Sequence, residues 1–430
     1  IKSMEIPEFT FTEVAPLMAN LPESKQDVEI KTMEEYDQAF GSILYRTTLP
    51  ELKSETLLKV SNPHDYAQIF IDGKYVGTLD RRNGEKEIKL PSCPAGATLD
   101  ILVEAMGRIN FGRAIKDFKG ITDKVTITEN RDGHDFVCDL KNWEVFNLPD
   151  EQEFYESMEF LPIGAFTPGE GERLPRGVYR GTFNVKKPQD TFIDFETWGK
   201  GLVYVNGHPL GRIWEIGPQQ TLYMPGCWLK EGENEILIFD IIGPREAKSR
   251  GLKEPVLDKL QLTNSPVHRA EGESLDLNSL TPVASGTFRP GNGWQEVMLQ
   301  EPARGRFIGI EALDALNGGD VASIAEFYVL GPDGKRLSRE PWTVRYADSE
   351  DVKNGNHLAD KIFDLQESTY WSTVKGNPFP HQVVIDLGGT HDVTGFQFLP
   401  RMEQETPGAI GNFRVYVMDE PNVISGTTAK

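Results

Sequence analysis

Short runs in which apolar and polar residues alternate, separated by glycine and proline turns, fill the first 265 residues. Residues 67–79 (AQIFIDGKYVGTL) place two such runs around Asp72-Gly73, and residues 201–213 (GLVYVNGHPLGRI) repeat the arrangement around Asn206-Gly207. A period of two is typical of strands with one buried face. Asp-Gly and Asn-Gly accept the positive φ angles of a type I′ turn. The pattern therefore predicts two β-hairpins.

The two hairpins belong to a longer internal repeat. Residues 45–49 (YRTTL) resemble residues 179–183 (YRGTF), and residues 96–107 (GATLDILVEAMG) resemble residues 232–243 (GENEILIFDIIG). Matching positions are 134 residues apart in the first pair and in the hairpins, and 136 apart in the last pair. A register kept over this length indicates a duplicated β-domain. We predict an all-β chain with two successive jelly-roll sandwiches, at residues 36–130 and 131–264, and few helices.

Two segments within the first 265 residues show no sustained alternation of apolar and polar residues. Residues 1–35 carry scattered charges and predict an extended connector, whereas residues 164–177 are rich in glycine, proline and charge and predict a long exposed loop.

Composition narrows the function. A chain of 430 residues is long enough for two or three hydrophobic cores. Its 45 basic and 66 acidic residues give a net charge of −21, which disfavours nucleic acid and anionic membranes as partners and leaves neutral ligands such as glycans. No apolar run approaches the roughly 20 residues of a spanning helix, so we expect no membrane insertion.

Longer motifs carry a family resemblance. Residues 41–50, 103–121, 142–149 and 199–241 resemble the accessory β-domains of the family 35 glycoside hydrolases, the β-galactosidases, and the resemblance covers roughly residues 1–264. In that family a (β/α)8 barrel comes first and carries two catalytic carboxylates that release galactose with retention. The sequence shows no strand–helix alternation of the barrel kind. The resemblance implies a non-catalytic C-terminal portion that supports a barrel, is inactive alone, and has no catalytic residue of its own.

The same resemblance assigns roles to particular segments. Residues 1–35 would lead from the missing barrel, and Asn110, Phe111 and Gly112 would face it. Four acids beside predicted strands are interpreted as solvated or hydrogen-bonded surface groups, because hydrolysis needs two carboxylates converging in one pocket: Glu104, Glu144, Glu196 and Glu215. Five aromatic residues suit either a sugar platform or the space between sheets, and the second interpretation is favoured: Trp198, Tyr204, Trp214, Tyr223 and Trp228.

From about residue 281 a second resemblance begins, after a linker at 265–280. Residues 357–373, 380–401 and 413–420 resemble the front half of a discoidin-like domain, the fold of coagulation factor 5/8 type C domains and of many carbohydrate-binding modules. Residues 294–331 resemble its back half, although they come first. We therefore expect a circularly permuted discoidin-like β-sandwich over residues 281–430.

This resemblance implies two candidate sites. A structural calcium would take its oxygens from Asp364, Thr369, Ala325 and Glu326. Because residues 364–366 are Asp-Leu-Gln where such loops usually have Asp-Gly-Asp, a hydrogen-bonded loop without metal is the alternative, and no cofactor is required. Sugar contacts are expected on rim loops, where each candidate could also be structural: Trp294, Phe379, His381, Arg401 and Asn412.

The expected partners are galactose-containing glycans, bound within residues 281–430, and the catalytic barrel of the same gene product. The resemblance further implies export from a bacterium, to the periplasm, the cell surface or the medium. A free-standing carbohydrate-binding or adhesion protein is the alternative.

Overall fold

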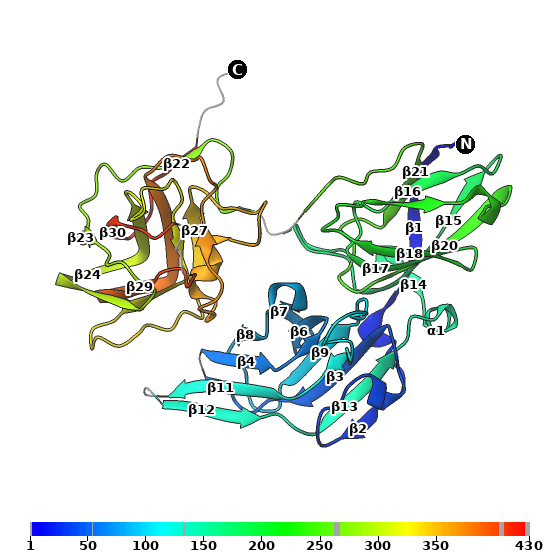
Figure 1. Cartoon of the computed structure of the whole chain (residues 1–430), viewed down its shortest axis with the longest axis horizontal. Helices are drawn as coiled ribbons and strands as arrows, with labels where there is room; N and C mark the ends of the chain where they lie inside the picture. The colour runs from blue at the N-terminus through cyan, green and yellow to red at the C-terminus, as the bar shows by residue number, and fades with distance from the viewer. Residues whose placement is uncertain (1, 54, 132–133, 262–266, 404–407, 426–430) are drawn as a thin grey trace.

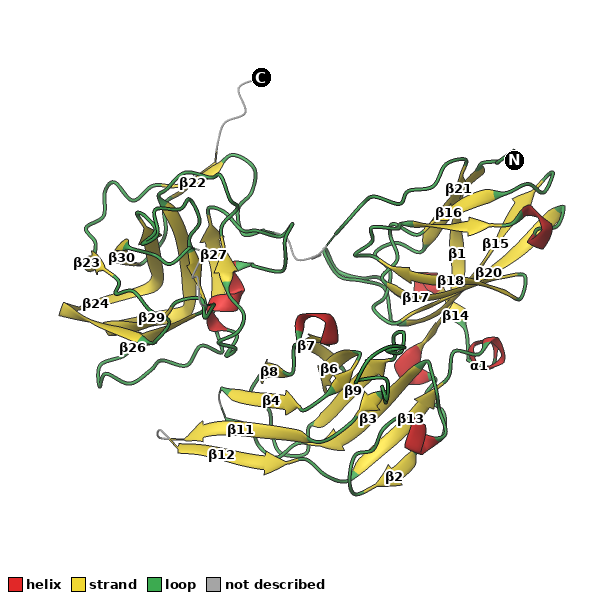
Figure 2. Cartoon of the chain, in the orientation of Figure 1, coloured by secondary structure: helices red, strands yellow, loops and turns green. Residues whose placement is uncertain are grey.

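The computed structural model describes residues 2–53, 55–131, 134–261, 267–403 and 408–425, which form three β-sandwiches (Figures 1 and 2). All ladders between named strands are antiparallel, and the described residues contain one α-helix, α1 (Gln152–Glu156). Short 3-10 turns make up the other helical segments: η1 (Leu17–Ala19), η2 (Glu34–Tyr36), η3 (Arg81–Asn83), η4 (Ile163–Ala165), η5 (Gly226–Trp228) and η6 (Ala359–Phe363). The predicted all-β class is confirmed.

The first sandwich packs a six-stranded sheet against a four-stranded one. The larger sheet runs in the order β2 (Lys25–Asp27), β13 (Trp143–Leu148), β3 (Ser42–Thr48), β9 (Thr98–Glu104), β6 (Tyr66–Ile71) and β7 (Lys74–Asp80). The smaller runs β12 (His134–Asp139), β11 (Val125–Arg131), β4 (Thr56–Val60) and β8 (Glu87–Leu90), and β5 (Pro63–His64) pairs with β10 (Gly120–Ile121). Buried aliphatic side chains with Tyr45 and Trp143 fill the space between them.

The second sandwich is joined by a strand from the start of the chain, β1 (Ile6–Pro16). The first part of β1 pairs with β21 (Lys248–Leu252), and its second part pairs with β15 (Gly177–Val185) and β14 (Leu161–Pro162). Beyond β15 lie β20 (Gly232–Asp240), β17 (Lys200–Val205) and β18 (His208–Trp214), and beyond β21 lie β16 (Thr191–Asp194) and β19 (Thr221–Met224). One bulged strand thus connects both sheets of this sandwich.

The internal repeat is visible in strand order and in detail. The order β7-β6-β9-β3 of the first sandwich corresponds to β18-β17-β20-β15 of the second. Both hairpin turns have positive φ angles, 48° and 77° at Asp72-Gly73 and 48° and 81° at Asn206-Gly207. Both hairpins also carry a bulge, after Ile69 and after Val203. The two predicted hairpins are confirmed.

Two expected boundaries need correction. Residues 1–35 are not a connector, because β1 and β2 are paired strands of the second and first sandwich. The first sandwich also continues past residue 130, since β12 and β13 complete its two sheets. The strand next to β3 is β13, which follows it in the chain, whereas the strand next to β15 is β1, which precedes it. The period-two pattern of a strand does not say which sheet it joins.

The first two sandwiches share a hydrophobic core. Leu44 and Leu102 of the first pack in one cluster with Leu237 and Phe239 of the second. Buried polar contacts cross the same boundary: the Nζ of Lys200 lies 2.8 Å from a carboxylate oxygen of Glu104, and Gln68 donates to the Ile241 carbonyl. A buried apolar interface, with polar contacts across it, holds the two sandwiches as one unit.

The third sandwich has its own core and begins within the expected linker at residues 265–280, because the strand at Glu273–Leu275 pairs with the end of this domain. Its sheet runs β23 (Ala284–Thr287), β30 (Asn412–Met418), β24 (Gln295–Ala312), β29 (His381–Leu399) and β26 (Glu326–Leu330), and β27 (Thr343–Ala347) also pairs with β29. Two short ladders join β22 (Glu273–Leu275) to β31 (Val423–Ser425) and β25 (Ser323–Ile324) to β28 (Trp371–Ser372). Strand β24 lies between β29 and β30, although it precedes both. The permuted order stays a prediction.

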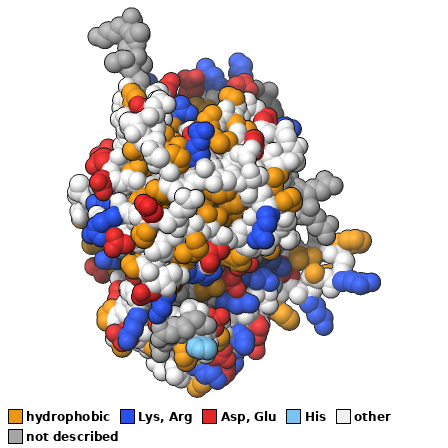
Figure 3. All heavy atoms as spheres, turned by 90° about the vertical axis from the view of Figure 1, so that its left-hand side faces the viewer, with side chains coloured by type: hydrophobic (Ala, Val, Ile, Leu, Met, Phe, Trp, Pro, Cys, Tyr) orange, Lys and Arg blue, Asp and Glu red, His pale blue; other side chains and the backbone are white. Residues whose placement is uncertain are grey.

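The third sandwich contacts the first through residues 339 and 340. The carboxylate of Glu340 accepts hydrogen bonds from the backbone N–H and hydroxyl of Ser92, at 2.7 and 2.6 Å, and the backbone N–H of Arg339 donates to Glu55 at 2.8 Å. On the face that this sandwich presents in Figure 3, acidic and basic side chains are interspersed. Within the described residues no helix has the length and hydropathy of a membrane span.

Candidate functional site

A cleft of about 870 Å³ lies where the three sandwiches meet. The first sandwich contributes Tyr75 on β7 and Lys89 on β8, the second contributes Arg176 and Trp214, and the third contributes the segment around η6. Five aromatic side chains line it together with six acidic and six basic ones. Small-ligand sites are usually mostly apolar with a few polar groups, so the many charged side chains of this cleft suit a strongly polar ligand.

Trp214 is held rigidly in the wall of this cleft. The guanidinium carbon of Arg82 lies 4.1 Å and the Nζ of Lys200 lies 4.4 Å from its ring centroid, and the ring of Tyr66 meets it edge-on at 5.6 Å. Each cation gains from the negative face of the indole. Because two cations already lie against its ring, Trp214 supports the wall of the cleft and offers little face for a ligand.

Tyr75 and Arg176 form a second aromatic–cation pair. The guanidinium carbon of Arg176 lies 5.0 Å from the Tyr75 ring centroid and 4.7 Å from that of Phe70, and its Nε donates to Gln68 at 3.0 Å. Burial lowers the pKa of Arg176, and no carboxylate of the described residues pairs with it. Tyr75 itself is 51% exposed. The pair therefore presents an open ring and a cation with spare donors.

The wall from the third sandwich contains polar atoms without partners. The indole N–H of Trp342 and the Oδ1 of Asp360 are buried and have no hydrogen-bond partner among the described residues. On the facing wall, burial lowers the pKa of Lys89 to about 8. Buried polar atoms normally have partners, so these two atoms are exceptions in this wall.

The five predicted rim residues do not form one cluster. Trp294 and Arg401 flank the place where the start of β24 pairs with the end of β29, whereas Phe379, His381 and Asn412 lie where β24 ends and β29 and β30 begin. Trp294 donates to Glu367 at 3.2 Å, and the guanidinium of Arg401 stacks 4.0 Å over Tyr370 and pairs with Glu403 at 2.6 Å. Asn412 donates to Asp314 at 2.6 Å.

His381 differs from the expectation of an exposed contact. It is fully buried, its Nδ1 lies 2.7 Å from a carboxylate oxygen of Asp348, and the ring of Phe379 meets it edge-on at 4.7 Å. Its position on the sheet buries it, so it is not an exposed rim residue.

Three of the four predicted calcium ligands do come together. Thr369 donates its hydroxyl hydrogen bond to Asp364 at 2.6 Å, and the carboxyl groups of Asp364 and Glu326 are neighbours. The buried guanidinium of Arg339 binds Glu326 directly and already supplies a positive charge. Within the described residues no group of three or more His, Cys, Asp or Glu side chains is placed to hold a metal. A divalent cation would have to share this space with Arg339, so calcium stays a prediction of the resemblance and no role is derived from it.

Comparison with known proteins agrees with these three units. Residues 31–149 match the family model "Beta-galactosidase, first all-beta domain", residues 177–234 match "Beta-galactosidase, galactose-binding domain", and residues 346–424 match "F5/8 type C domain". The chain combines two β-galactosidase accessory domains with an F5/8 type C domain. The first model extends to residue 149, in agreement with β13 belonging to the first β-galactosidase domain.

Individual relatives match the β-galactosidase part. The chain is 39% identical over 211 residues to Beta-galactosidase of Mus musculus, 35% over 205 residues to Beta-galactosidase-1-like protein 2 of Homo sapiens and 32% over 238 residues to Beta-galactosidase 17 of Arabidopsis thaliana. These matches cover 45%, 47% and 50% of the chain and 31%, 30% and 33% of the relatives. The chain thus spans about a third of the length of the curated relatives it matches.

Three of the four acids that lie beside predicted strands form ion pairs among the described residues, and Glu144 is the exception. Glu104 binds Lys200 and Arg212, Glu215 binds Arg173 at 2.7 Å, and Glu196 binds Lys259. Glu104 and Glu215 are hydrogen-bonded, as one of the two expected alternatives states, but they are buried and do not lie on the surface. Glu144 lies half-buried on β13, opposite Arg46 in the ladder.

The aromatic residues of the second domain divide into two groups. Trp198 is fully buried between the sheets, as expected. Trp214 lines the cleft, Tyr223 is 48% exposed, Tyr204 contacts Tyr155, and Trp228 stacks on His208. Sequence reasoning missed the cleft because its walls come from three domains. The sequence clue to the cleft was the loop predicted at residues 164–177. Its Arg173 and Arg176 are half-buried in the structure and line the cleft.

Proposed function

We propose that this chain is the non-catalytic C-terminal portion of a family 35 β-galactosidase, whose barrel hydrolyses terminal β-galactosides with retention, and that it binds carbohydrate. One observation carries the proposal: two β-galactosidase accessory domains follow each other in one fused unit, and the described residues contain only antiparallel ladders. A (β/α)8 barrel requires eight parallel strands. The carboxylates of the catalytic pair therefore belong to another part of the parent protein.

The purified chain should not hydrolyse a chromogenic β-galactoside. Retaining hydrolysis needs two carboxyl groups about 5 Å apart in one pocket, and the buried Glu104 and Glu215 are each neutralised by basic side chains. Release of nitrophenol from nitrophenyl β-galactoside, followed over hours with homogeneous protein, measures this. Any turnover by the homogeneous chain would contradict the proposal, and its loss in Glu104→Gln or Glu215→Gln would identify the carboxylate responsible.

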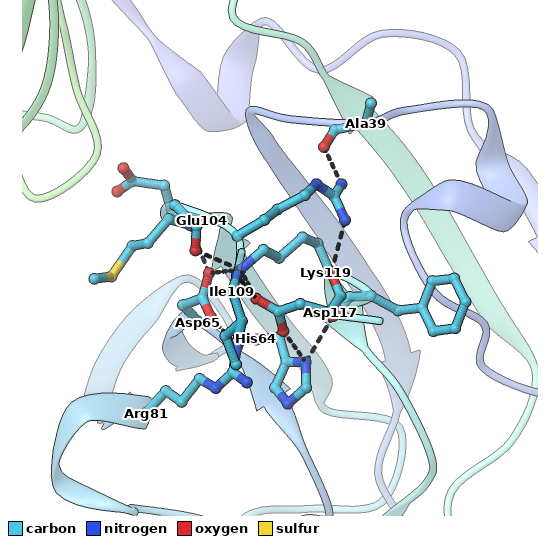
Figure 4. A network of polar contacts seen from close by, with 12 residues as sticks. Ala39, His64, Asp65, Arg81, Glu104, Ile109, Asp117 and Lys119 are labelled. Carbon is cyan, nitrogen blue, oxygen red and sulfur yellow. Dashed lines mark hydrogen bonds and ion pairs between the residues drawn. The ribbon is translucent and has the colours of Figure 1, made fainter. Parts of the chain in front are cut away.

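The surface that would meet the barrel is the segment at residues 105–119. Its base is fixed by an ion network, in which the Nζ of Lys119 lies 2.7 Å from Asp65, 2.9 Å from Asp117 and 3.1 Å from the Gly107 carbonyl (Figure 4). Arg108 reaches from the same segment to the carbonyls of Asp117 and Ala39. The network gives the segment a defined shape although it contains no regular element before β10.

Apolar side chains project from this fixed segment. Phe111 is 88% exposed and Ile115 is 59% exposed, and Phe118 is half-exposed beside them in the chain. Large apolar side chains on an ordered surface mark a contact with another domain or protein. This supports the expectation that Asn110, Phe111 and Gly112 face the barrel.

The double variant Phe111→Asp/Ile115→Asp should lose affinity for the barrel of the same gene product. Both side chains are exposed, so the variant should have the same unfolding midpoint temperature as the wild type. Two carboxylates in an apolar contact should raise the dissociation constant for the barrel at least tenfold. Analytical ultracentrifugation of the chain with the separately produced barrel measures the affinity. The matched control is Val137→Asp, an equally exposed apolar position on β12. Equal affinity of the double variant and the control would show that this segment is not the contact.

A free-standing carbohydrate-binding or adhesion protein is the second candidate, favoured by the F5/8 type C domain at residues 346–424. The reading frame upstream of residue 1 separates the two: a frame that encodes a (β/α)8 barrel supports the enzyme portion, and a frame that starts near residue 1 supports the second candidate. On the resemblance alone, the proposal includes export from a bacterial cell.

A further inference from the structure

We propose that the cleft between the three sandwiches binds a neutral galactoside oligosaccharide, and that docking of the third sandwich completes this site. The inference rests on the proposed carbohydrate-binding function. It places the sugar in this cleft and not at the rim residues expected in the third sandwich. It also gives the three domains a joint role that none of them has alone.

The size and charge of the cleft select the ligand class. Its volume of about 870 Å³ falls within the range of about 300–1,000 Å³ of small-molecule sites. Its six acidic and six basic side chains balance, so neither an anionic nor a cationic ligand is favoured overall. Charged side chains form strong hydrogen bonds with hydroxyl groups. A short oligosaccharide fits this lining. Its hydroxyl groups can bind the charged side chains, and its apolar face can pack on the aromatic rings.

Tyr75 is the ring on which the sugar would lie. It is 51% exposed, its hydroxyl is fixed by Thr78 at 2.6 Å, and Arg176 lies against its ring. The C–H face of a galactose ring packs on an aromatic face in the same way as other apolar surface. Arg176 has no carboxylate partner among the described residues, so its guanidinium remains able to donate to sugar hydroxyls.

The third sandwich supplies complementary groups on the opposite wall. The indole N–H of Trp342 can only donate, and the Oδ1 of Asp360 can only accept when the acid is ionised. Both are buried, both line the cleft, and both have no partner among the described residues. An unpaired buried polar atom costs about 1–3 kcal/mol. A shift of either side chain toward the cleft would let a sugar hydroxyl, which donates and accepts at once, pair with its free atom.

The third wall is held in place at the edge of the cleft, through its lining residue Glu340. Ser92 donates two hydrogen bonds to Glu340, and Ser92 is an exposed residue that does not line the cleft. A carboxylate at position 92 would lie against that of Glu340 and drive the sandwiches apart by like-charge repulsion. The site can therefore be opened without changing any cleft side chain.

Isothermal titration calorimetry of the full chain with methyl β-galactopyranoside and β-1,4-galactobiose tests the inference. Tyr75→Ala should weaken binding about tenfold, and Ser92→Asp should weaken it about tenfold while small-angle scattering shows a larger radius of gyration. Two matched controls should bind as the wild type does: Phe40→Ala, an aromatic residue of similar exposure (55%) outside the cleft, and Ser157→Asp, an exposed serine on the second sandwich.

The possible results separate this inference from the proposed function. If the wild type binds and both Tyr75→Ala and Ser92→Asp bind equally well, the sugar lies elsewhere, for example near Trp294 or Arg401, and the cleft proposal is overturned. If the wild type binds neither sugar at millimolar concentration, both the proposed carbohydrate binding and the cleft proposal are overturned. Unfolding curves of the variants, compared with the wild type, exclude a loss of folded protein as the cause.

Discussion

Replacing Lys119 with methionine should lower the free energy of unfolding of the first sandwich by about 3–5 kcal/mol. The Lys119 side chain is completely buried, and its ammonium group gives all three of its hydrogen bonds to Asp65, Asp117 and the Gly107 carbonyl. Methionine keeps the apolar stem but leaves two buried carboxylates to share Arg81, which lies 2.6 and 2.8 Å from them. Urea denaturation followed by tryptophan fluorescence measures the loss.

A control and a pH series test the cause of this loss. Lys141→Met removes an exposed ion pair with Glu29 and should cost less than about 1 kcal/mol. Burial alone would raise the pKa of Asp117, but the hydrogen bonds from Lys119 and Arg81 lower it to about 2, below its ordinary value of 3.8. Stability from this ionised group is complete above pH 4 and is lost as the pH falls toward 2. The difference between wild type and variant should shrink over that window, and a difference independent of pH would indicate lost packing instead.

Local chemistry was enough to predict the hairpins and the duplication. Asp72-Gly73 and Asn206-Gly207 specify their turns through adjacent residues, and the register of the repeat follows from the sequence itself. Sheet membership is different, because it depends on which distant strand offers a partner. Strand β1 lies in a segment without a sustained period, and its pairing with β15, a strand far along the chain, makes it part of the second sandwich.

The candidate site was less accessible from the sequence. The sequence around each lining residue does not by itself indicate a site. Arg176 belongs to a loop rich in glycine and proline, and Trp342 precedes a strand. Their meeting in one cleft depends on how three domains pack, which no local pattern records. His381 shows the converse error, because a histidine and an aromatic residue near a strand end suggested a sugar contact, whereas the histidine is buried on Asp348.

Replacing Arg339 with methionine should destabilise the third sandwich by about 3–5 kcal/mol. Arg339 is fully buried, binds Glu326, donates to the Tyr328 hydroxyl at 2.6 Å, and lies with its guanidinium carbon 3.5 Å from the Tyr328 ring centroid. Without it, the buried Glu326 faces the carboxyl of Asp364 with no counter-charge, and one of its oxygens has no partner even in the wild type. Differential scanning calorimetry should show the transition of this domain at a lower temperature, while Arg304→Met, at an exposed pair with Asp392, leaves it unchanged.

A double variant separates the unpaired charge from the lost packing of the arginine. Burial already raises the pKa of Glu326, so the energy of this acid depends on the cation beside it. Glu326→Gln combined with Arg339→Met removes both charges and keeps similar volumes, and replacing a buried pair by neutral groups is often far less costly than removing one partner. The double variant should therefore be more stable than Arg339→Met by at least about 1 kcal/mol. Equal instability of the two variants would mean that the packing of Arg339 against Tyr328, and not its charge, holds this part of the sandwich.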